Sequence, residues 1–337
     1  MDGLSVEPKA GRPGPDCHCN AGRVPLARRV LRRPSNTAIA AAIVFAVILW
    51  GGNNAGTKYL VSHPASPWPP LWTGGTRFLC AGLVMEALLR WTRWFGAAHP
   101  VDGALRRRLW WRGGLSLAAY IMAFNWALRF TSASHVALYL GAAPVWALLW
   151  EGRPADVRIA GQRYGAALLA LTGVLVLLWP ALGHSGFHLL GEVLGISSSV
   201  LWTNYGRQCR TLTQGLSGAE VSAKTMWRAG LLLTLAGAGE IGLRGWHPTG
   251  WQMGVQGYCV LAGGVAAFGI WNMALRRWPT SKVYLFNNLI PLSTMTWAHF
   301  TLGEKVTPTF WLAILLIGAG VVLGQTRFRH EPAGGRG

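Results

Sequence analysis

Two arginines of this chain, Arg77 and Arg228, lie well inside long apolar stretches. A guanidinium at such a depth in a membrane is costly, so it normally faces other helices and has a partner there. Its planar donors match a carboxylate or a phosphate in bidentate geometry. The two residues therefore predict an anchor for an anionic group of a substrate. The alternative is a structural arginine that pairs with helix-end carbonyls or an acid, or that extends toward water.

Aromatic and amide side chains occur at similar depth in other apolar stretches. Such a lining suits an amphipathic organic solute, because rings pack against its apolar part and amides orient its polar part. The alternative is helix packing in which Asn side chains bond between helices. The further substrate-binding residues that we predict are Trp50, Asn53, Asn125, Trp202, Asn204 and Asn272.

Two prolines, Pro144 and Pro291, lie in the middle of apolar stretches. Proline frees a backbone carbonyl and bends a helix. We predict that each acts as a hinge or a cavity wall, with plain helix curvature as the alternative.

The composition indicates a membrane protein. Of 337 residues, 51% are hydrophobic and 13% are charged, whereas soluble domains carry about 25% charged residues. Apolar runs long enough to cross a membrane as helices recur along the chain, and helices satisfy every backbone group internally. We expect an all-α integral membrane protein with ten transmembrane helices. The expected spans are roughly 37–60, 69–89, 113–130, 133–150, 162–180, 190–208, 219–243, 251–275, 280–302 and 307–325.

The basic residues are distributed unevenly. A formal net charge of +19 is also found in nucleic-acid-binding proteins. With ten spans and a cytoplasmic N-terminus, however, 24 of the 31 Lys and Arg residues fall on the cytoplasmic side. This is the positive-inside pattern. It predicts a multi-pass protein of the cytoplasmic (inner) membrane with both termini in the cytoplasm, and it argues against nucleic acid as a partner.

The chain also contains an internal repeat. Residues 125–174 recur without a gap at an offset of 147 residues. Each copy holds five expected spans, so the second copy must enter the membrane in the opposite sense, as in many secondary transporters. The matched pairs include Asn125/Asn272, Pro144/Pro291, Gly173/Gly320 and, after slippage in the loops, Trp50/Trp202 and Arg77/Arg228. The expected parts are a disordered basic tail (1–36), a first repeat (37–180), a second, inverted repeat (190–325) and a short cytoplasmic tail (326–337).

Several motifs resemble the EamA-type drug/metabolite transporter superfamily. They are a Trp followed closely by Asn in the first span, "RF" in the second, "ALRFTSASHVALYLGAAPVWALL" from Ala127 and "LFNNLIPLSTMTWAHFTLGEKVTP" from Leu285. The resemblance extends over about 37–325 and implies ten helices in two repeats. It also implies transport of small organic metabolites, with export of amino acids or related solutes favoured. The first repeat has "WEGRP" at Trp150 in place of "LGE", so a role tied to that motif is expected only in the second half.

Our hypothesis is therefore a secondary transporter that works by alternating access on a small-molecule substrate in the lipid bilayer. We expect no enzyme activity, no cofactor and no metal; the oligomeric state stays open. The alternatives are a membrane-embedded enzyme, which would need a polar constellation at a membrane face, and a non-transporting scaffold. A carboxylate proton relay is not evident, because all the candidates fall near span ends, and the coupling ion stays open. These candidates are Glu86, Glu151, Glu192, Glu220, Glu240 and Glu304. Lone histidines such as His135 and His299 more often make structural hydrogen bonds.

Overall fold

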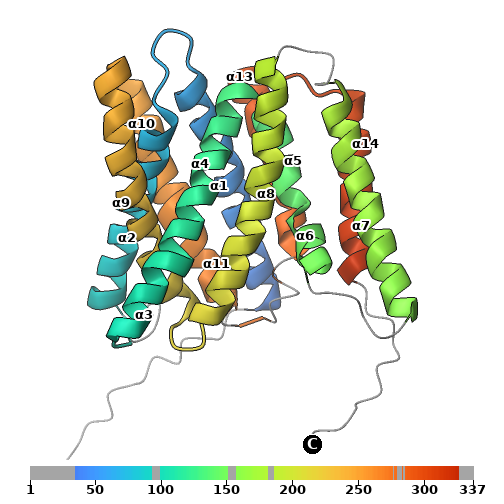
Figure 1. Cartoon of the computed structure of the whole chain (residues 1–337), viewed down its shortest axis with the longest axis horizontal. Helices are drawn as coiled ribbons and strands as arrows, with labels where there is room; N and C mark the ends of the chain where they lie inside the picture. The colour runs from blue at the N-terminus through green and yellow to red at the C-terminus, as the bar shows by residue number, and fades with distance from the viewer. Residues whose placement is uncertain are drawn as a thin grey trace, which may run out of the picture. The chain divides into compact units, whose positions relative to one another are not determined.

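The structure is a computed structural model, and all secondary structure among its described residues is helical, with short connections between the helices (Figure 1). The described residues are 35–92, 99–150, 157–180, 186–275, 277–278, 283 and 285–325. Residues from Asn36 onward form one compact unit. The two expected tails lie outside the described residues, apart from residues 35 and 36.

The helices follow the ten expected spans in order. The first repeat contains α1 (Asn36–Ser62), α2 (Pro70–Trp91), α3 (Gly103–Arg108), η1 (Leu109–Gly114), α4 (Leu115–Phe130), α5 (Ala133–Gly141), α6 (Ala143–Trp150) and α7 (Val157–Leu178). The second contains α8 (Gly186–Leu212), α9 (Gly218–Arg244), α10 (Gly250–Tyr258), η3 (Cys259–Ala267), α11 (Phe268–Leu275), η4 (Leu285–Leu289), α13 (Ile290–Leu302) and α14 (Pro308–Gln325). The third span of each repeat is one continuous helix with a π-helical segment inside it, η1 or η3.

Three helical stretches in the described part of the chain are long and apolar enough to cross a membrane by length and composition alone. They are Asn36–Ser62, Val157–Leu178 and Gly250–Ala274, and a shorter apolar helix covers Pro308–Gly324. Other helices carry charged residues, as α9 does with Glu220, Lys224 and Arg228. A protein interior can accommodate such groups, but a hydropathy average counts them against a span. The number of ten transmembrane helices therefore stays a prediction.

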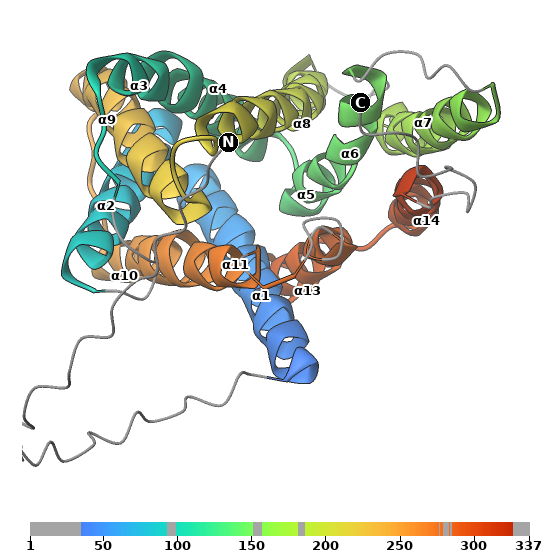
Figure 2. The same ribbon diagram turned by 90° about the horizontal axis from the view of Figure 1, so that it is seen from below.

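Helices of one repeat pack mainly on helices of the other. α2 lies along α9, α7 along α14, α4 along α8 and α1 along α13. Both views show the first two of these pairs side by side (Figures 1 and 2). The interior is consequently built at the contact between the repeats.

The α2–α9 contact depends on glycines spaced seven residues apart on each helix. A Cβ atom added at Gly230 would lie 2.1 Å from the backbone nitrogen of Leu79, so only glycine allows this approach. The facing residues are Gly75 with Thr234, Gly82 with Trp227, Leu79 with Gly230, and Trp72 with Gly237. Numbers rise on one helix as they fall on the other, so the helices are antiparallel.

The contact also relates the two repeats. The offset that pairs Arg77 with Arg228 also pairs Leu79 with Gly230, and these last two residues touch. Antiparallel contact between equivalent positions is what a two-fold relation between inverted repeats requires.

The α7–α14 pair shows the same relation. Gly173 and Gly320 are equivalent in the repeat, and each lies against the other helix. A Cβ atom at Gly173 would lie 2.8 Å from Ile317, and one at Gly320 would lie 2.7 Å from the carbonyl oxygen of Ala166. Both helix pairs support the inverted two-repeat architecture.

Both predicted prolines follow an interruption of a helix. α5 ends at Gly141 and α6 begins at Ala143, so Pro144 is the second residue of α6. In the second repeat the 3-10 helix η4 ends at Leu289 and α13 begins at Ile290, so Pro291 lies in the first turn of α13. Proline suits a first turn because its missing N–H is not needed there. The side chain of Pro144 lies outside the described residues, and the hinge role of both prolines stays a prediction.

Candidate functional site

Arg77 lies near the middle of α2 with 3% of its surface exposed. Its Nη1 donates to the Oδ1 of Asn53 at 3.4 Å and to the hydroxyl of Thr57, both on α1. Its Nε has no hydrogen-bond partner among the described residues. Within the same residues, no carboxylate lies within ion-pair distance of the guanidinium. The alternative in which Arg77 pairs with an acid is therefore not supported by the described residues.

Two further side chains lie beside the guanidinium. Tyr120 comes from α4 and Cys259 from η3. The thiol of Cys259 also lies 3.7 Å from the backbone oxygen of Asn53. We refer to Asn53, Thr57, Arg77, Tyr120 and Cys259 as the Arg77 cluster. It joins α1, α2 and α4 of the first repeat to η3 of the second.

Asn125 and Gln256 face the same helix α2. Asn125 is fully buried, and its Nδ2 donates to the carbonyl oxygen of Pro70 at 2.8 Å. The Nε2 of Gln256 donates to the backbone oxygen of Thr73 and to the hydroxyl of Thr76, each at 2.9 Å. The side-chain oxygens of both amides are buried and have no donor among the described residues. Two acceptors and one guanidinium donor are thus left unsatisfied around α2.

Trp50 connects the cluster to the second repeat. Its Nε1 donates to the backbone oxygen of Gly263 at 3.1 Å. Its ring lies 5.2 Å from the rings of both Phe268 and Trp271. A Cβ atom at Gly263 would lie 2.6 Å from the Oδ1 of Asn53, so this glycine allows η3 to approach the amide.

The equivalent residues of the second repeat are arranged differently. The ring of Trp202 lies tilted against that of Tyr120, with ring centroids 5.0 Å apart. Trp202 therefore borders the Arg77 cluster. Asn272 donates to the backbone oxygen of Phe268 on its own helix at 2.8 Å. Asn204 is half-buried on α8.

Arg228 lies apart from the Arg77 cluster. Its Nη1 donates to the backbone oxygen of Lys224 at 2.7 Å, one turn earlier on α9. The guanidinium carbon lies 4.1 Å from the ring centre of Trp227 and 5.4 Å from that of Trp110. Its Nε, like that of Arg77, has no hydrogen-bond partner among the described residues. The ring contacts join α9 to η1 through cation–π interactions, which favours a structural role.

The sequence analysis missed Thr57, Cys259 and Gln256. Each is small or neutral and carries no signal of its own. Cys259 and Gln256 come near Asn53 and Thr76 only when α10 and η3 of the second repeat pack on α1 and α2, and Thr57 lies one turn after Asn53 on α1. The π-helical register of η3 was equally invisible in the apolar pattern.

Glu304, in the "LGEK" motif, has a clear structural role. Its Oε1 accepts from the backbone N–H of Ala133 at 2.7 Å, and its Oε2 accepts from the N–H and hydroxyl of Ser134 at 3.2 and 2.7 Å. The carboxylate therefore caps the N-terminus of α5, where free N–H groups favour negative charge. Gly303, with φ of 68°, ends α13 and turns the chain toward this cap.

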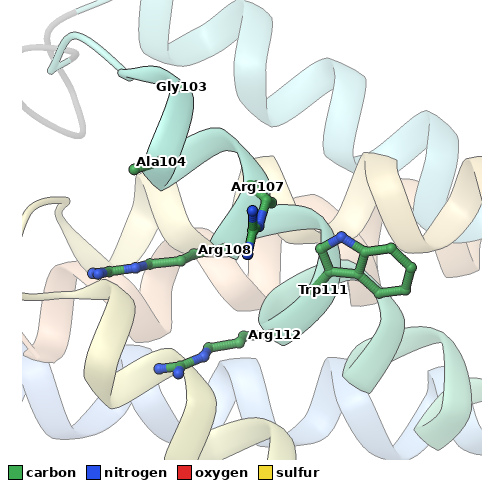
Figure 3. A pocket seen from close by; sticks show the side chains of 6 residues that line it. All are labelled: Gly103, Ala104, Arg107, Arg108, Trp111 and Arg112. Atoms are coloured by element: carbon green, nitrogen blue, oxygen red, sulfur yellow. The ribbon is translucent and has the colours of Figure 1, made fainter.

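A surface hollow of about 910 Å³ lies along α3 and η1. Figure 3 shows Arg108 and Arg112 extending to one side of these helices and the ring of Trp111 on the other, with Arg107 between them. Basic side chains next to tryptophan are typical of the membrane–water boundary. None of the predicted substrate-binding residues lines this hollow.

Comparisons with known proteins agree with the architecture. The EamA-like transporter family matches residues 37–179 and again residues 189–324, one match for each repeat. A Pseudomonas aeruginosa protein described as uncharacterised is 31% identical over 256 residues, which cover 73% of this chain and 81% of that protein. A solved structure titled "Crystal structure of protein" has a similar fold, with a TM-score of 0.55 and 18% identity over 86% of this chain and 98% of its own. The chain belongs to the EamA-like transporter family, and it is therefore a multi-pass membrane protein of a family that transports small solutes.

Proposed function

We propose that this protein is a secondary transporter that carries small organic solutes bearing a carboxylate across the cytoplasmic membrane, with amino acids as the favoured class. The observation that carries the proposal is Arg77, a buried guanidinium at the contact between the repeats with an unpaired Nε and no acid partner in the described residues. A buried charge without a counter-charge is costly. A substrate carboxylate would supply the missing negative charge and accept hydrogen bonds from two N–H groups at once.

The surroundings favour an amino acid over a simple anion. The unpaired oxygens of Asn125 and Gln256 are acceptors, which an ammonium group needs. The rings of Trp50, Tyr120 and Trp202 supply apolar faces for a side chain. The proposed site therefore consists of Trp50, Asn53, Arg77, Asn125 and Trp202 from the sequence prediction, with Thr57, Tyr120, Gln256 and Cys259 added.

Alternating access is supported by the place of the site between the repeats. A substrate bound there contacts α1, α2 and α4 on one side and α8, α10 and η3 on the other. Rocking of one repeat against the other would open the site to each membrane face in turn. Pro144 and Pro291, which follow helix interruptions at equivalent positions, are the proposed bending points. Asn204 and Asn272 stay as predicted contributors in another state of this cycle, whereas Arg228 is assigned a structural role on its contacts within α9 and with η1.

The test is solute counterflow in proteoliposomes at equal pH on both sides, with a pool of labelled amino acids and other metabolites. The wild-type protein should exchange a carboxylate-bearing solute. Arg77→Lys keeps the charge but loses the planar fork, so exchange at low solute concentration should fall at least about tenfold, as expected for a loss of ~1.4 kcal/mol.

Arg228→Lys is the matched comparison, since it makes the same chemical change at the equivalent position of the other repeat. We expect exchange within about twofold of the wild type. A loss with Arg228→Lys but not with Arg77→Lys would place the site in the second repeat. If both variants exchanged a neutral solute at the wild-type rate, that result would contradict the proposed substrate class.

A further inference from the structure

A second buried polar group lies between the repeats, around Glu192 of α8. This side chain is 2% exposed. Its Oε1 accepts from the hydroxyl of Thr131 and lies 2.8 Å from the Nδ1 of His135, and its Oε2 accepts from the hydroxyl of Tyr139 at 2.5 Å. We refer to these four residues as the Glu192 cluster.

The Glu192 cluster connects the two repeats. Glu192 comes from the second repeat, and its three partners come from the first, on α5 and just before it. α5 and α8 pack side by side (Figure 1). The approach is close because Gly191 and Gly195 flank the carboxylate. A Cβ atom at Gly191 would lie 2.8 Å from Phe130, and one at Gly195 would lie 2.8 Å from the ring of Tyr139.

Glu192 was expected near a span end, and no proton relay was evident from that position; its burial was not predicted. The residue does lie near the start of α8. Helix contact through the two glycines, which a hydropathy pattern does not show, removes it from water.

One member of the cluster retains contact with the surface. The side chain of His135 is 25% exposed, whereas that of Glu192 is 2% exposed. Thr131 and Tyr139 are buried as well. The imidazole thus contacts the carboxylate through Nδ1 while a quarter of its side chain stays exposed. An imidazole in this position can pass a proton from water to a buried acid.

The other charged groups at this end of the bundle have partners of their own. Lys58 of α1 donates to the backbone oxygens of Leu128 and Thr131, each at 2.8 Å. Arg129, at the end of α4, donates to the backbone oxygen of Val61 at 2.9 Å. Glu304 caps α5 as described above. The titratable groups in direct contact with the Glu192 carboxylate, among the described residues, are His135 and Tyr139.

We propose that Glu192 is a proton-binding site that couples proton movement to solute transport, with His135 as its link to water. This inference rests on the proposed carrier function. In this relay hydronium gives a proton to the Nε2 of His135 while the Nδ1–H proton passes to the Glu192 carboxylate. One O–H bond of hydronium and the Nδ1–H bond break, an Nε2–H bond and a carboxyl O–H bond form, and the negative charge of Glu192 disappears. Hydrogen bonds to a charged acceptor are about twice as strong as neutral ones, so the contact between α5 and α8 weakens. Release of the proton restores the contact.

The experiment uses the full-length protein in proteoliposomes, with a pH-sensitive dye enclosed and the best exchanged amino acid as solute. For the wild type, an imposed pH difference should change the initial transport rate at least about threefold, and solute addition should move protons. Glu192→Gln keeps the side-chain shape but cannot titrate. It should abolish both responses while counterflow at equal pH stays within about twofold of wild type, because exchange needs no net proton movement.

Glu240→Gln is the matched control. It removes a carboxylate of α9 that bonds the backbone of Leu71 and lies outside the Glu192 cluster, and it should keep the response to pH. Glu192→Asp should also keep the response, at a lower rate. Should Glu192→Gln fail to fold, His135→Gln gives an independent arm, in which proton movement should slow at least about threefold.

The outcomes separate the two proposals. Counterflow by the wild type with no response to a pH difference would overturn proton coupling and leave the carrier intact. A Glu192→Gln protein that still responds like the wild type would overturn the role of Glu192. A folded wild-type protein that exchanges none of the solutes would overturn the carrier and this inference with it.

Discussion

Arg77 illustrates how a single buried charge defines the proposed site. Its guanidinium has two neutral oxygen partners from α1 and one unpaired nitrogen. Hydrogen bonds to charged groups contribute about 1.5–3 kcal/mol each to stability. The folded protein therefore depends on Asn53 and Thr57 to hold the guanidinium, and in the proposed transport cycle they do so until a substrate binds.

Thr57→Val tests this dependence. The change keeps the side-chain shape and removes one acceptor, so the free energy of unfolding should fall by about 1–3 kcal/mol. Thermal unfolding in detergent would show this as a lower Tm. A transported carboxylate solute should recover part of the loss, because binding to the native state raises stability.

Thr172→Val is the control for that measurement. Thr172 is exposed on α7 and bonds its own helix at Leu168, so its replacement should leave the Tm nearly unchanged. Equal effects of the two changes would show that Thr57 does no more than an ordinary helix threonine.

Glu304 supports a second measurement. Glu304→Gln removes the charge and one acceptor from the cap of α5, which should lower the free energy of unfolding by about 0.5–2 kcal/mol. Hydrogen exchange at Ala133 and Ser134 should speed up. The neighbouring Lys305 is exposed, and Lys305→Gln should change neither quantity. Unchanged exchange in Glu304→Gln would contradict the capping role.

The α2–α9 pair shows how glycine spacing sets the position of these residues. The two helices approach until their backbones are in contact. This contact fixes the register of α2 against α9, and with it the position of Arg77 in the interior of the bundle. Side chains at the contact would push the helices apart and widen the interior.

Gly230→Ala should therefore destabilise the protein, since the added carbon would lie 2.1 Å from the backbone of Leu79. Overpacking of this kind costs about 1–3 kcal/mol, measured as a lower Tm or as reduced yield of monodisperse protein. Gly239→Ala on the same helix has no atom within 4 Å of the added carbon, and it should be neutral or slightly stabilising. A neutral Gly230→Ala would contradict the close contact.

Helix order, the two repeats and the depth of Arg77 could be predicted from the sequence, because hydropathy and self-similarity are local or periodic signals. The partners of Arg77 could not. Cys259 follows Asn53 by about 200 residues, and only packing between the repeats brings them together. The burial of Glu192 could not be predicted for the same reason, since its place near a span end gave no sign that helix contact through two glycines would remove it from water.

For the whole molecule, the inverted repeat makes a topological prediction. Ala65 follows α1, and Gln214 follows α8, the equivalent helix of the second repeat; both residues are exposed. In a protein whose five cysteines are replaced by serine, Ala65→Cys in intact cells should react with a membrane-impermeant maleimide. Gln214→Cys should react only after the cells are opened. Labelling of both sites from the same side would contradict the inversion.

The α2–α9 contact also has a consequence for synthesis. Thr234 is made about 160 residues after Gly75, which at ~5–20 residues per second takes on the order of 10–30 s. During that interval the glycine face of α2 is not yet covered by α9. Arg77 also lacks its final neighbours from η3. Lipid, or a factor of the insertion machinery, has to occupy that face until α9 displaces it. The first half of the protein must therefore persist for this interval in an arrangement, without α9 against α2, that the complete fold does not have.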